Sequence, residues 1–384
     1  MNQSAPLAEF LQSYLGGPLW PWLLVAAVLV LFLVALPFGG FATYVERKVA
    51  ADLQDRVGPN RVGPYGVLQF IADAVKMLAK EDFIPPTGDK FLFNLAPFLV
   101  IVGSCTAFAF LPLAKNFMGV DLNVGLLMLL AVTTLITPGI LLGAWSSHNK
   151  WSLIGGMRAT AQIVSYEIPV LLLMSPAILI SGSLGIGQIV TLQGWTGQSG
   201  TVSVVGAHGW NIFHNPFAPI ACLFLFIAGL AETNRLPFDL PEAESELVSG
   251  FNTEFSGMRF GLYALAEFAE VFVMCGLVTA LYLGGWQPPF FNWENVFPET
   301  PELLIALLQL ATFSAKTLSL VLVVMWLRWT LPRLRADQLM QFCWKIMVPV
   351  SLLCLLGTAL WMWSFHGASF PQVVVGLFLG GGPQ

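Results

Sequence analysis

The chain has 384 residues, of which 56% are hydrophobic and only 10% are charged. Soluble domains contain about 25% charged residues, so a chain of this composition could not cover its surface with polar groups. The composition therefore excludes a water-soluble enzyme, a disordered chain and a fibrous chain. One membrane-spanning helix takes about 20 apolar residues, so the length has room for roughly eight or nine spans with their loops. The sequence predicts an all-α integral membrane protein.

Eight apolar segments, joined into a single membrane domain over residues 1–384, are predicted to cross the membrane. In chain order they occupy residues 22–44, 91–113, 122–145, 159–181, 217–231, 261–283, 303–327 and 346–365. The loops predicted on one side of the membrane cover residues 46–90, 146–158, 232–260 and 328–345.

The orientation of these spans follows from the basic residues. The four loops just named carry 15 of the 17 Lys and Arg residues of the chain, although the net charge is −5. Basic residues favour the cytoplasmic side of a membrane. The sequence therefore predicts that these loops are cytoplasmic and that both termini lie on the outer, periplasmic side. The outer loop at residues 183–216 contains no Lys, Arg, Asp or Glu.

The five cysteines give no sign of a metal site. Their spacing contains no CxxC pair and no Cys/His ligand pattern, which argues against a zinc ion or an iron–sulfur cluster on this chain. Most of them lie within apolar segments, where a small buried thiol is common. No metal and no attached cofactor are therefore expected. The N-terminal apolar stretch lacks a preceding basic region, so no cleaved signal peptide is expected either.

The first cytoplasmic loop combines a rigid basic turn with an amphipathic helix. Two consecutive pentapeptides, Arg56–Asn60 and Arg61–Tyr65, both begin Arg-Val-Gly-Pro, and Gly-Pro pairs fix turns. A helix predicted at residues 67–80 is apolar except for one polar stripe, formed by Gln69, Asp73, Lys76 and Lys80. Such a helix lies in the membrane interface or roofs a cavity that opens toward the cytoplasm. The alternative for the basic turn is a contact with lipid headgroups.

Four charged side chains fall inside the predicted spans. Glu167 follows Arg158 by about nine residues, or about 13 Å along a helix, which puts its carboxylate well inside the bilayer. Glu267 and Glu270 share one face of the sixth span, and Lys316 is a lone base in the seventh. Charged groups at this depth are costly and indicate function, here proton or cation movement or a buried polar axis.

Two alternatives for these charges stay open. Glu167 could be a neutral carboxylic acid that joins two helices through a hydrogen bond. An ion pair between Lys316 and an acid of the sixth span would satisfy both groups, but the sequence does not choose between the acids.

The third cytoplasmic loop is acidic on a side that is otherwise basic. Against two basic residues it carries six acids, which are Glu232, Asp239, Glu242, Glu244, Glu246 and Glu254. Pro241 at the start of a helix, with acids in its first turn, explains part of this pattern through the helix dipole. Glu242 and Glu246 lie at i and i+4 on one helix face, so their like charges should raise the pKa of at least one of them. The loop is a candidate proton-accepting funnel, and the alternative is a solvated acidic loop.

Several long motifs resemble one family of membrane proteins. They are Glu46–Lys48, Arg56–Gly66, Arg158–Pro169, Ala231–Gly257 and Arg328–Gln338. These motifs resemble the H-type membrane subunit of NADH–quinone oxidoreductase (respiratory complex I), whose mitochondrial counterpart is subunit 1. The resemblance extends from about residue 20 to residue 365. Related subunits of hydrogenase-type complexes share weaker forms of the motifs.

The resemblance implies a bacterial inner-membrane subunit that holds no redox centre. Such a subunit forms the membrane side of a quinone-binding chamber and couples quinone reduction to proton translocation. Quinone, either ubiquinone or menaquinone, would be its substrate rather than a bound cofactor. The implied partners are the peripheral-arm subunits that complete the quinone site, neighbouring small membrane subunits and lipid, with no nucleic acid.

The resemblance and the charge pattern together assign roles to residues of this sequence. The predicted chamber residues are Arg47, Arg56, Arg61, Gln69, Asp73 and Phe238. The residues predicted for proton movement and coupling are Glu167, Glu232, Arg235, Asp239, Glu242, Glu244, Glu246, Glu267, Glu270 and Lys316. Arg235 is also expected to steady the acidic loop by ion pairing.

Two other classes of function stay open at this point. The same acids could serve a stand-alone ion or proton transporter, although the chain shows no internal repeat of the kind from which many transporters are built. The chain could also be a structural anchor that docks a peripheral enzyme, as in a hydrogenase-type complex. The length of the motifs favours the quinone-reductase subunit over both.

Overall fold

The computed structural model describes residues 36–115, 117–194, 209–241, 248–288, 293 and 301–365. Its regular elements are helices, and the only extended pairing within these ranges is an isolated bridge between Ala114 and Phe117. Six of the described helical segments are long and apolar enough to cross a membrane: Lys90–Phe108, Gly125–Ser146, Lys150–Ser181, Gly257–Tyr282, Glu302–Thr330 and Ala336–Ser364. A shorter apolar helix occupies Ala218–Glu232. The prediction of an all-α membrane protein is confirmed.

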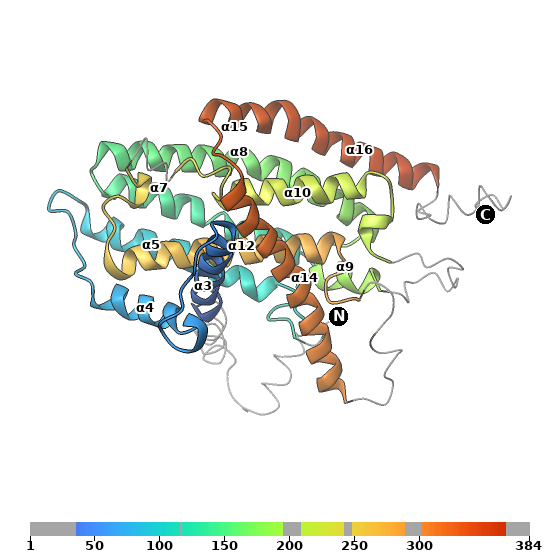
Figure 1. The fold of residues 1–384 in the computed structure, drawn as a ribbon. Helices are drawn as coiled ribbons and strands as arrows, with labels where there is room; N and C mark the ends of the chain where they lie inside the picture. The colour runs from blue at the N-terminus through green and yellow to red at the C-terminus, as the bar shows by residue number, and fades with distance from the viewer. Residues whose placement is uncertain are drawn as a thin grey trace, which may run out of the picture.

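The helices are labelled as in Figure 1. The first half of the chain contains α3 (Leu36–Leu53), α4 (Gln69–Ala79), α5 (Lys90–Ala107), α6 (Gly125–Thr133), α7 (Ile136–Ser146), α8 (Lys150–Ser181) and α9 (Ile186–Leu192). The second half contains α10 (Ala218–Glu232), α12 (Gly257–Tyr282), α14 (Glu302–Thr330), α15 (Ala336–Phe342) and α16 (Val348–Ser364). A π-helical turn at Cys343–Met347 joins α15 to α16.

Several helices extend beyond the apolar segments from which they were predicted. The first predicted span ends at residue 44, but α3 continues to Leu53. The fourth begins at residue 159, but α8 already begins at Lys150. The predicted loop at 328–345 contains the whole of α15. Hydropathy marks only the part of a helix at lipid depth, and a helix continues into the interface wherever its backbone hydrogen bonds do. Residues 22–35 of the first span lie outside the described residues.

The long helix α12 lies at the centre of the bundle. It contacts α5, α10, α14, α3 and α4, and most of its C-terminal half is buried. Figure 1 shows α5, α7, α8, α10, α12 and α16 running in roughly one direction, whereas α14 crosses them obliquely. The helices α14 and α16 bury only a small part of their surface. This arrangement puts α3, α4 and the C-terminus of α14 beside the N-terminus of α12.

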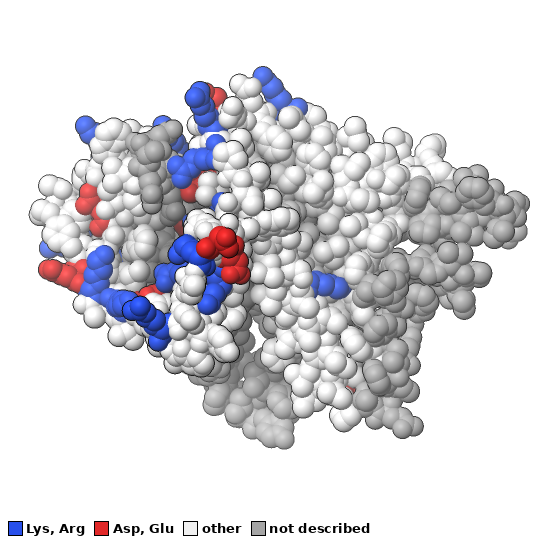
Figure 2. Space-filling model, in the orientation of Figure 1, with Lys and Arg blue, Asp and Glu red and all other residues white. Residues whose placement is uncertain are grey.

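Charged side chains gather at one end of the bundle. Figure 2 shows Lys, Arg, Asp and Glu concentrated over α3, α4 and the nearby ends of the long helices, while the other half of the view is almost free of them. We call these the charged end and the neutral end. The described part of the outer loop predicted at 183–216 lies at the neutral end, where Ile186, Ile189 and Val190 of α9 are buried against the bundle.

Candidate functional site

A cluster of ion-paired side chains occupies the charged end. We call Glu46, Arg235, Glu267 and Arg328 the charged cluster; they come from α3, the segment after α10, α12 and α14. Arg235 Nη1 lies 3.7 Å from Glu46 Oε2, and Arg235 Nη2 lies 3.9 Å from Glu267 Oε2. Arg328 pairs with the other oxygen of Glu46. The Arg235 guanidinium also stacks over the Phe268 ring, 4.1 Å from its centroid.

Burial makes these pairs energetically important. Only 6% of Arg235 and 8% of the Glu46 side chain are exposed. Charges taken out of water need partners, and removing one partner from a buried pair costs about 3–5 kcal/mol. The charged cluster therefore holds together four segments that are distant in the sequence, and it ties their positions to the charge state of its members.

A row of carboxylates runs from α8 to the charged cluster. We call Glu167, Glu232, Glu270 and Glu267 the carboxylate row. The charges of Glu167 and Glu232 interact with each other, and Glu270 interacts with both Glu232 and Glu267 and with Arg235. Glu232 ends α10 and is buried, as is Glu270 on α12, whereas Glu167 on α8 is half-buried. The structure thus brings together acids from three helices, which the sequence placed on two separate spans and in the third cytoplasmic loop.

Two carboxylates of this row have oxygens without hydrogen-bond partners. Glu232 has one buried carboxylate oxygen with no hydrogen-bond partner among the described residues. Glu167 likewise makes no hydrogen bond within the described ranges, so the alternative that it joins two helices as a hydrogen-bonded acid finds no partner there. Buried polar groups are usually satisfied, and unsatisfied ones need a water or a functional reason.

Lys316 does not join the carboxylate row. Its ammonium lies at the neutral end, where it donates to the backbone carbonyls of Leu283, Gly285 and Gln287. The structure therefore pairs Glu267 of α12 with Arg235 and gives Lys316 backbone partners. A flexible lysine side chain can satisfy its three N–H groups on any cluster of oxygens, which sequence spacing does not disclose.

The basic loop and α4 lie beside the charged cluster. Asp73 on the polar stripe of α4 accepts hydrogen bonds from Arg47 (2.6 Å) and Gln69 (2.9 Å), and the ammonium of Lys76 lies 3.8 Å away. Arg56 donates to its neighbour Gln54 at 2.8 Å. The structure thus joins three of the predicted chamber residues, Arg47, Gln69 and Asp73, through one carboxylate, and it leaves the Arg56 and Arg61 side chains exposed on the loop.

The helix α4 has three distinct faces. Phe70 packs against Gly40 of α3, and Met77 packs near Gly261 of α12. Opposite the polar stripe, an apolar face is exposed, with Ile71, Val75 and Leu78 as its members. This agrees with the amphipathic helix predicted at 67–80, and the packed face fixes α4 at the charged end.

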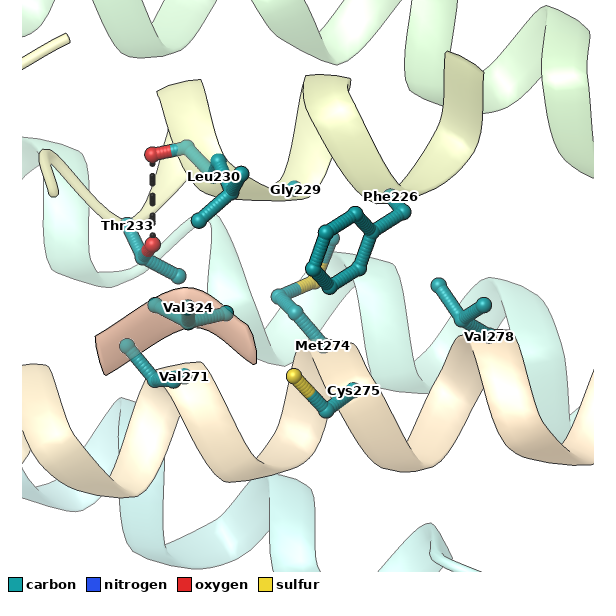
Figure 3. A pocket seen from close by; sticks show the side chains of 9 residues that line it. All are labelled: Phe226, Gly229, Leu230, Thr233, Val271, Met274, Cys275, Val278 and Val324. Atoms are coloured by element: carbon teal, nitrogen blue, oxygen red, sulfur yellow. Dashed lines mark hydrogen bonds between the residues drawn. The ribbon is translucent and has the colours of Figure 1, made fainter. Parts of the chain in front are cut away.

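Two small cavities lie between α12 and α14. The first is about 10 Å³ in volume; it is lined by apolar groups of α10, α12 and α14 together with Thr233, whose hydroxyl donates to the Leu230 carbonyl (Figure 3). The second has the same volume and touches Glu46, Arg235 and Arg328. A cavity of this size holds about one water molecule. Val271 and Val324 line both cavities. Each cavity is too small to hold a quinone ring.

Comparison with known proteins adds a family to this geometry. The family profile described as NADH dehydrogenase matches residues 25–359. The chain belongs to the NADH dehydrogenase family. Three of its relatives are each named as the H-type subunit of NADH-quinone oxidoreductase. One from Anaeromyxobacter dehalogenans is 46% identical over 352 residues, which cover 88% of this chain and 82% of the relative. One from Chlorobaculum parvum is 43% identical, covering 88% and 92%, and one from Geobacillus thermodenitrificans is 44% identical, covering 86% and 91%.

Membership of the NADH dehydrogenase family confirms the resemblance drawn from the motifs. Within the described ranges, the structure brings together no group of three or more His, Cys, Asp or Glu side chains suited to a metal ion. The five cysteines are free and buried.

The segment after α10 is held by residues that sequence reasoning did not select. Gln162 of α8 donates to the backbone carbonyls of Ala231 and Phe238, at 2.7 Å each. Arg333 Nη2 lies 3.2 Å from Asp239 Oδ2. Phe238, predicted as a chamber residue, is buried between the rings of Tyr166 and Phe342. Packing fixes Phe238, because an aromatic ring beside an apolar helix face is most stable in contact with other rings.

Arg235 has different partners from those expected. It was predicted to steady the acidic loop, but the described structure directs its guanidinium to α3 and α12. Glu242, Glu244 and Glu246 lie outside the described residues, so their roles stay predictions. On the far side of that stretch, Glu254 accepts a hydrogen bond from Asn149 at 2.7 Å, and Ser152 donates to the Phe251 carbonyl.

Sequence reasoning missed Glu46 and Arg328 as site residues. Both stand inside motifs that carry the family resemblance, but each lies at the predicted edge of a span, where a charge is unremarkable. One feature of the sequence could have pointed to Glu46. Arg235 closely follows an apolar segment, where a buried cation needs an acidic partner, and Glu46 is the acid at the end of the first predicted span.

Proposed function

We propose that this chain is the membrane subunit of a proton-translocating NADH–quinone oxidoreductase, where it forms the membrane side of the quinone chamber and couples quinone reduction to proton movement. The proposal rests mainly on the observation that the carboxylate row continues into the charged cluster, because Glu267 belongs to both. The relatives' names support the assignment to the enzyme. The chain would supply no redox centre, and quinone would be a substrate rather than a resident cofactor.

The quinone side of this proposal involves α3, α4 and the basic loop. Arg47, Gln69 and Asp73 form a polar surface next to the charged cluster. The exposed loop arginines Arg56 and Arg61 provide positive charge beside it. Peripheral-arm subunits would complete the chamber there, and small membrane subunits and lipid would cover the remaining apolar surface. The chain would cross the bacterial inner membrane several times with both termini periplasmic, which the uneven distribution of Lys and Arg supports.

The coupling side follows from electrostatics. A change of charge near Arg235 alters its attraction to Glu46 and Glu267. Neighbouring carboxylates favour one another's protonated form, so a proton gained by one changes the tendency of the next to hold a proton. The carboxylate row can pass such a change from the charged cluster to α8. The water-sized cavity beside Arg235 and Arg328 can hold an intervening proton carrier.

The test uses the intact enzyme with single substitutions in the carboxylate row. Glu232→Gln and Glu167→Gln should each lower quinone reduction and proton pumping together, on the order of tenfold or more, because a side-chain proton carrier contributes at least that much. Glu302→Gln is the matched control: Glu302 is exposed at the N-terminus of α14. Full activity of both row variants in normally assembled enzyme would refute the coupling role.

Purification separates the proposal from a stand-alone transporter. In mild detergent the chain should migrate with a large hydrophilic arm that oxidises NADH. Migration as a monomer or homodimer, with ion flux after reconstitution in liposomes, would overturn the assignment. Row variants that lower assembly but leave turnover per assembled enzyme unchanged would instead indicate a structural anchor.

A further inference from the structure

Lys316 is a partly buried cation that lies apart from the proposed coupling route. It lies at the neutral end, on the face of α14 that meets the C-terminus of α12. Twelve residues, or about 18 Å of helix, separate it from Arg328 of the charged cluster. Its partners are backbone oxygens rather than carboxylates, which makes it unlike the other intramembrane charges.

Three carbonyl groups converge on the ammonium of Lys316. The Nζ atom lies 2.6 Å from the Leu283 oxygen, 3.0 Å from that of Gly285 and 2.6 Å from that of Gln287. The Trp210 ring covers the same atom, with its centroid 4.1 Å away. An ammonium has three N–H donors, so these carbonyls use all of them. We call this arrangement the carbonyl cage.

The turn that presents these carbonyls has a special backbone. Gly284 and Gly285 have φ values of +75° and +53°, which side chains rarely allow. A Cβ atom on Gly285 would lie 2.6 Å from the Val190 side chain, and one on Gly284 would meet the Trp210 ring. The turn can therefore aim these carbonyls at one point only because glycines occupy both positions.

The cage is also braced from outside. The Gln193 side chain donates to the Ala280 carbonyl at 2.7 Å and accepts from the backbone N–H of Gly284 at 3.0 Å. Thr312, one turn before Lys316 on α14, donates to the Trp286 carbonyl at 2.8 Å. The oxygens therefore stay in place whether or not a cation is present, and a rigid ring of carbonyls is the kind of site that binds a bare monovalent cation.

We propose that Lys316 is the built-in cation of a monovalent-cation site: its ammonium fills the carbonyl cage, fastens α14 to the end of α12 and so positions Arg328 against Glu46 at the other end of the helix. In this role Lys316 is a positioning residue and carries no protons. Removal of the side chain leaves a cage that takes potassium or ammonium. Only the effect on turnover rests on the proposed function; the cage itself does not.

The first experiment measures stability, which is independent of activity. Intact complexes carrying Lys316→Ala are heated in detergent at equal ionic strength with potassium, ammonium or N-methylglucamine as the cation. The variant should melt several degrees below the wild type in N-methylglucamine and regain much of the loss in potassium or ammonium, since a ligand that binds only the folded state raises its stability. The wild type, whose cage is filled, should not respond.

Lys115→Ala is the matched control, because Lys115 is an exposed lysine at the same end of the bundle. Its melting temperature should be the same in all three salts. The cage proposal is overturned if the Lys316→Ala complex responds to potassium and ammonium no more than the Lys115→Ala complex does.

The second experiment uses Lys316→Arg and keeps the proposal testable if the alanine variant fails to assemble. Arginine keeps the positive charge but cannot release a proton at working pH. The assembled enzyme should translocate as many protons per electron as the wild type, even if its turnover falls a few-fold. Normal quinone reduction with lost pumping would make Lys316 a proton carrier and overturn the positioning role. Absence of quinone reductase activity in the wild type would count against the proposed function alone.

Discussion

The two ends of the bundle are held together by different kinds of interaction. At the charged end, Arg235 bridges the carboxylates of Glu46 and Glu267, so side chains of opposite charge connect the helices. At the neutral end, Lys316 and Gln193 bind backbone carbonyls, so fixed dipoles connect them. A side-chain pair changes when a proton is gained or lost, whereas a carbonyl does not titrate. The interactions at the charged end can therefore change with protonation, whereas the carbonyl groups at the neutral end keep their dipoles at any pH.

The helix α14 connects these two kinds of interaction. It carries Lys316 toward one end and Arg328 toward the other, and Val321 and Val324 are buried between them. Because Lys316 holds α14 in place at the neutral end, a change of charge near Arg328 should cause little movement at the neutral end. Its structural effect should stay near the charged cluster or pass through α12. Four substitutions test whether the two ends of the bundle differ in this way.

The largest effect is expected for Arg235→Met. The substitution removes one of the two cations that pair with the buried Glu46 and also the partner of the partly exposed Glu267, which should cost about 3–5 kcal/mol of stability. Melting of the intact complex measures it. Lys345→Met, which removes an exposed cation, serves as the control. Equal melting temperatures for the two variants would mean that ion pairs do not hold the charged end together.

A smaller effect is expected at the neutral end for Gly285→Ala. The new Cβ would lie 2.6 Å from Val190 and the φ of +53° would be strained, which together should cost about 1–3 kcal/mol. Gly182→Ala is the control, because its φ is +65° but no atom lies within 4 Å of the added Cβ. If both variants lose the same stability, backbone strain alone matters and the close packing of the turn does not.

A weaker interaction at the charged end is the pair between Arg259 and Asp82, which lie 2.7 Å apart with 18% and 41% of their side chains exposed. Asp82→Asn should cost about 0.2–1 kcal/mol, because water and salt screen such a pair. The loss should shrink as ionic strength rises. A double-mutant cycle with Arg259→Gln measures the coupling, and a coupling that is independent of salt would contradict this interpretation.

The smallest effect concerns pH at the neutral end. Burial lowers the pKa of His214, so the folded protein holds the neutral imidazole, whereas the unfolded chain titrates near its usual value of about 6.5. As the pH falls through about 6.5, the unfolded state takes up the proton first and stability drops, until the folded state also becomes protonated. His214→Gln should remove this part of the pH dependence of melting between about pH 7.5 and pH 5. Parallel curves for variant and wild type would disprove it.

Local pattern was enough to predict the helices and the intramembrane charges. An apolar run of membrane length specifies a span regardless of its neighbours, so α5, α8, α12 and α14 appear where expected. Glu167 and Glu270 could be selected because a carboxylate is rare at that depth. The helix ends were harder to predict: α3 and α8 extend beyond their apolar runs since hydropathy stops at the lipid boundary.

The pairing of charges could not be predicted in the same way. Arg328 and Glu46 are separated by 282 positions, and neither motif indicates that the two side chains are in contact. An ion pair between Lys316 and an acid of the sixth span was left open, and in the structure Lys316 instead donates to three carbonyl oxygens of the glycine turn after α12. The contacts of Phe238 with the rings of Tyr166 and Phe342 likewise join segments that are far apart in the sequence.

Composition and local motifs were enough to establish the membrane class, the helices, the family and the intramembrane acids, because each of these depends on a single stretch of chain. Only the packing of the helices shows which charges meet, that Glu46 and Arg328 lie with Arg235, and that Lys316 is held by carbonyls. The difference arises because the sequence does not give distances between remote residues. An electrostatic interaction depends on the separation of two groups in space and on their burial, and both are set by how helices from distant parts of the chain pack.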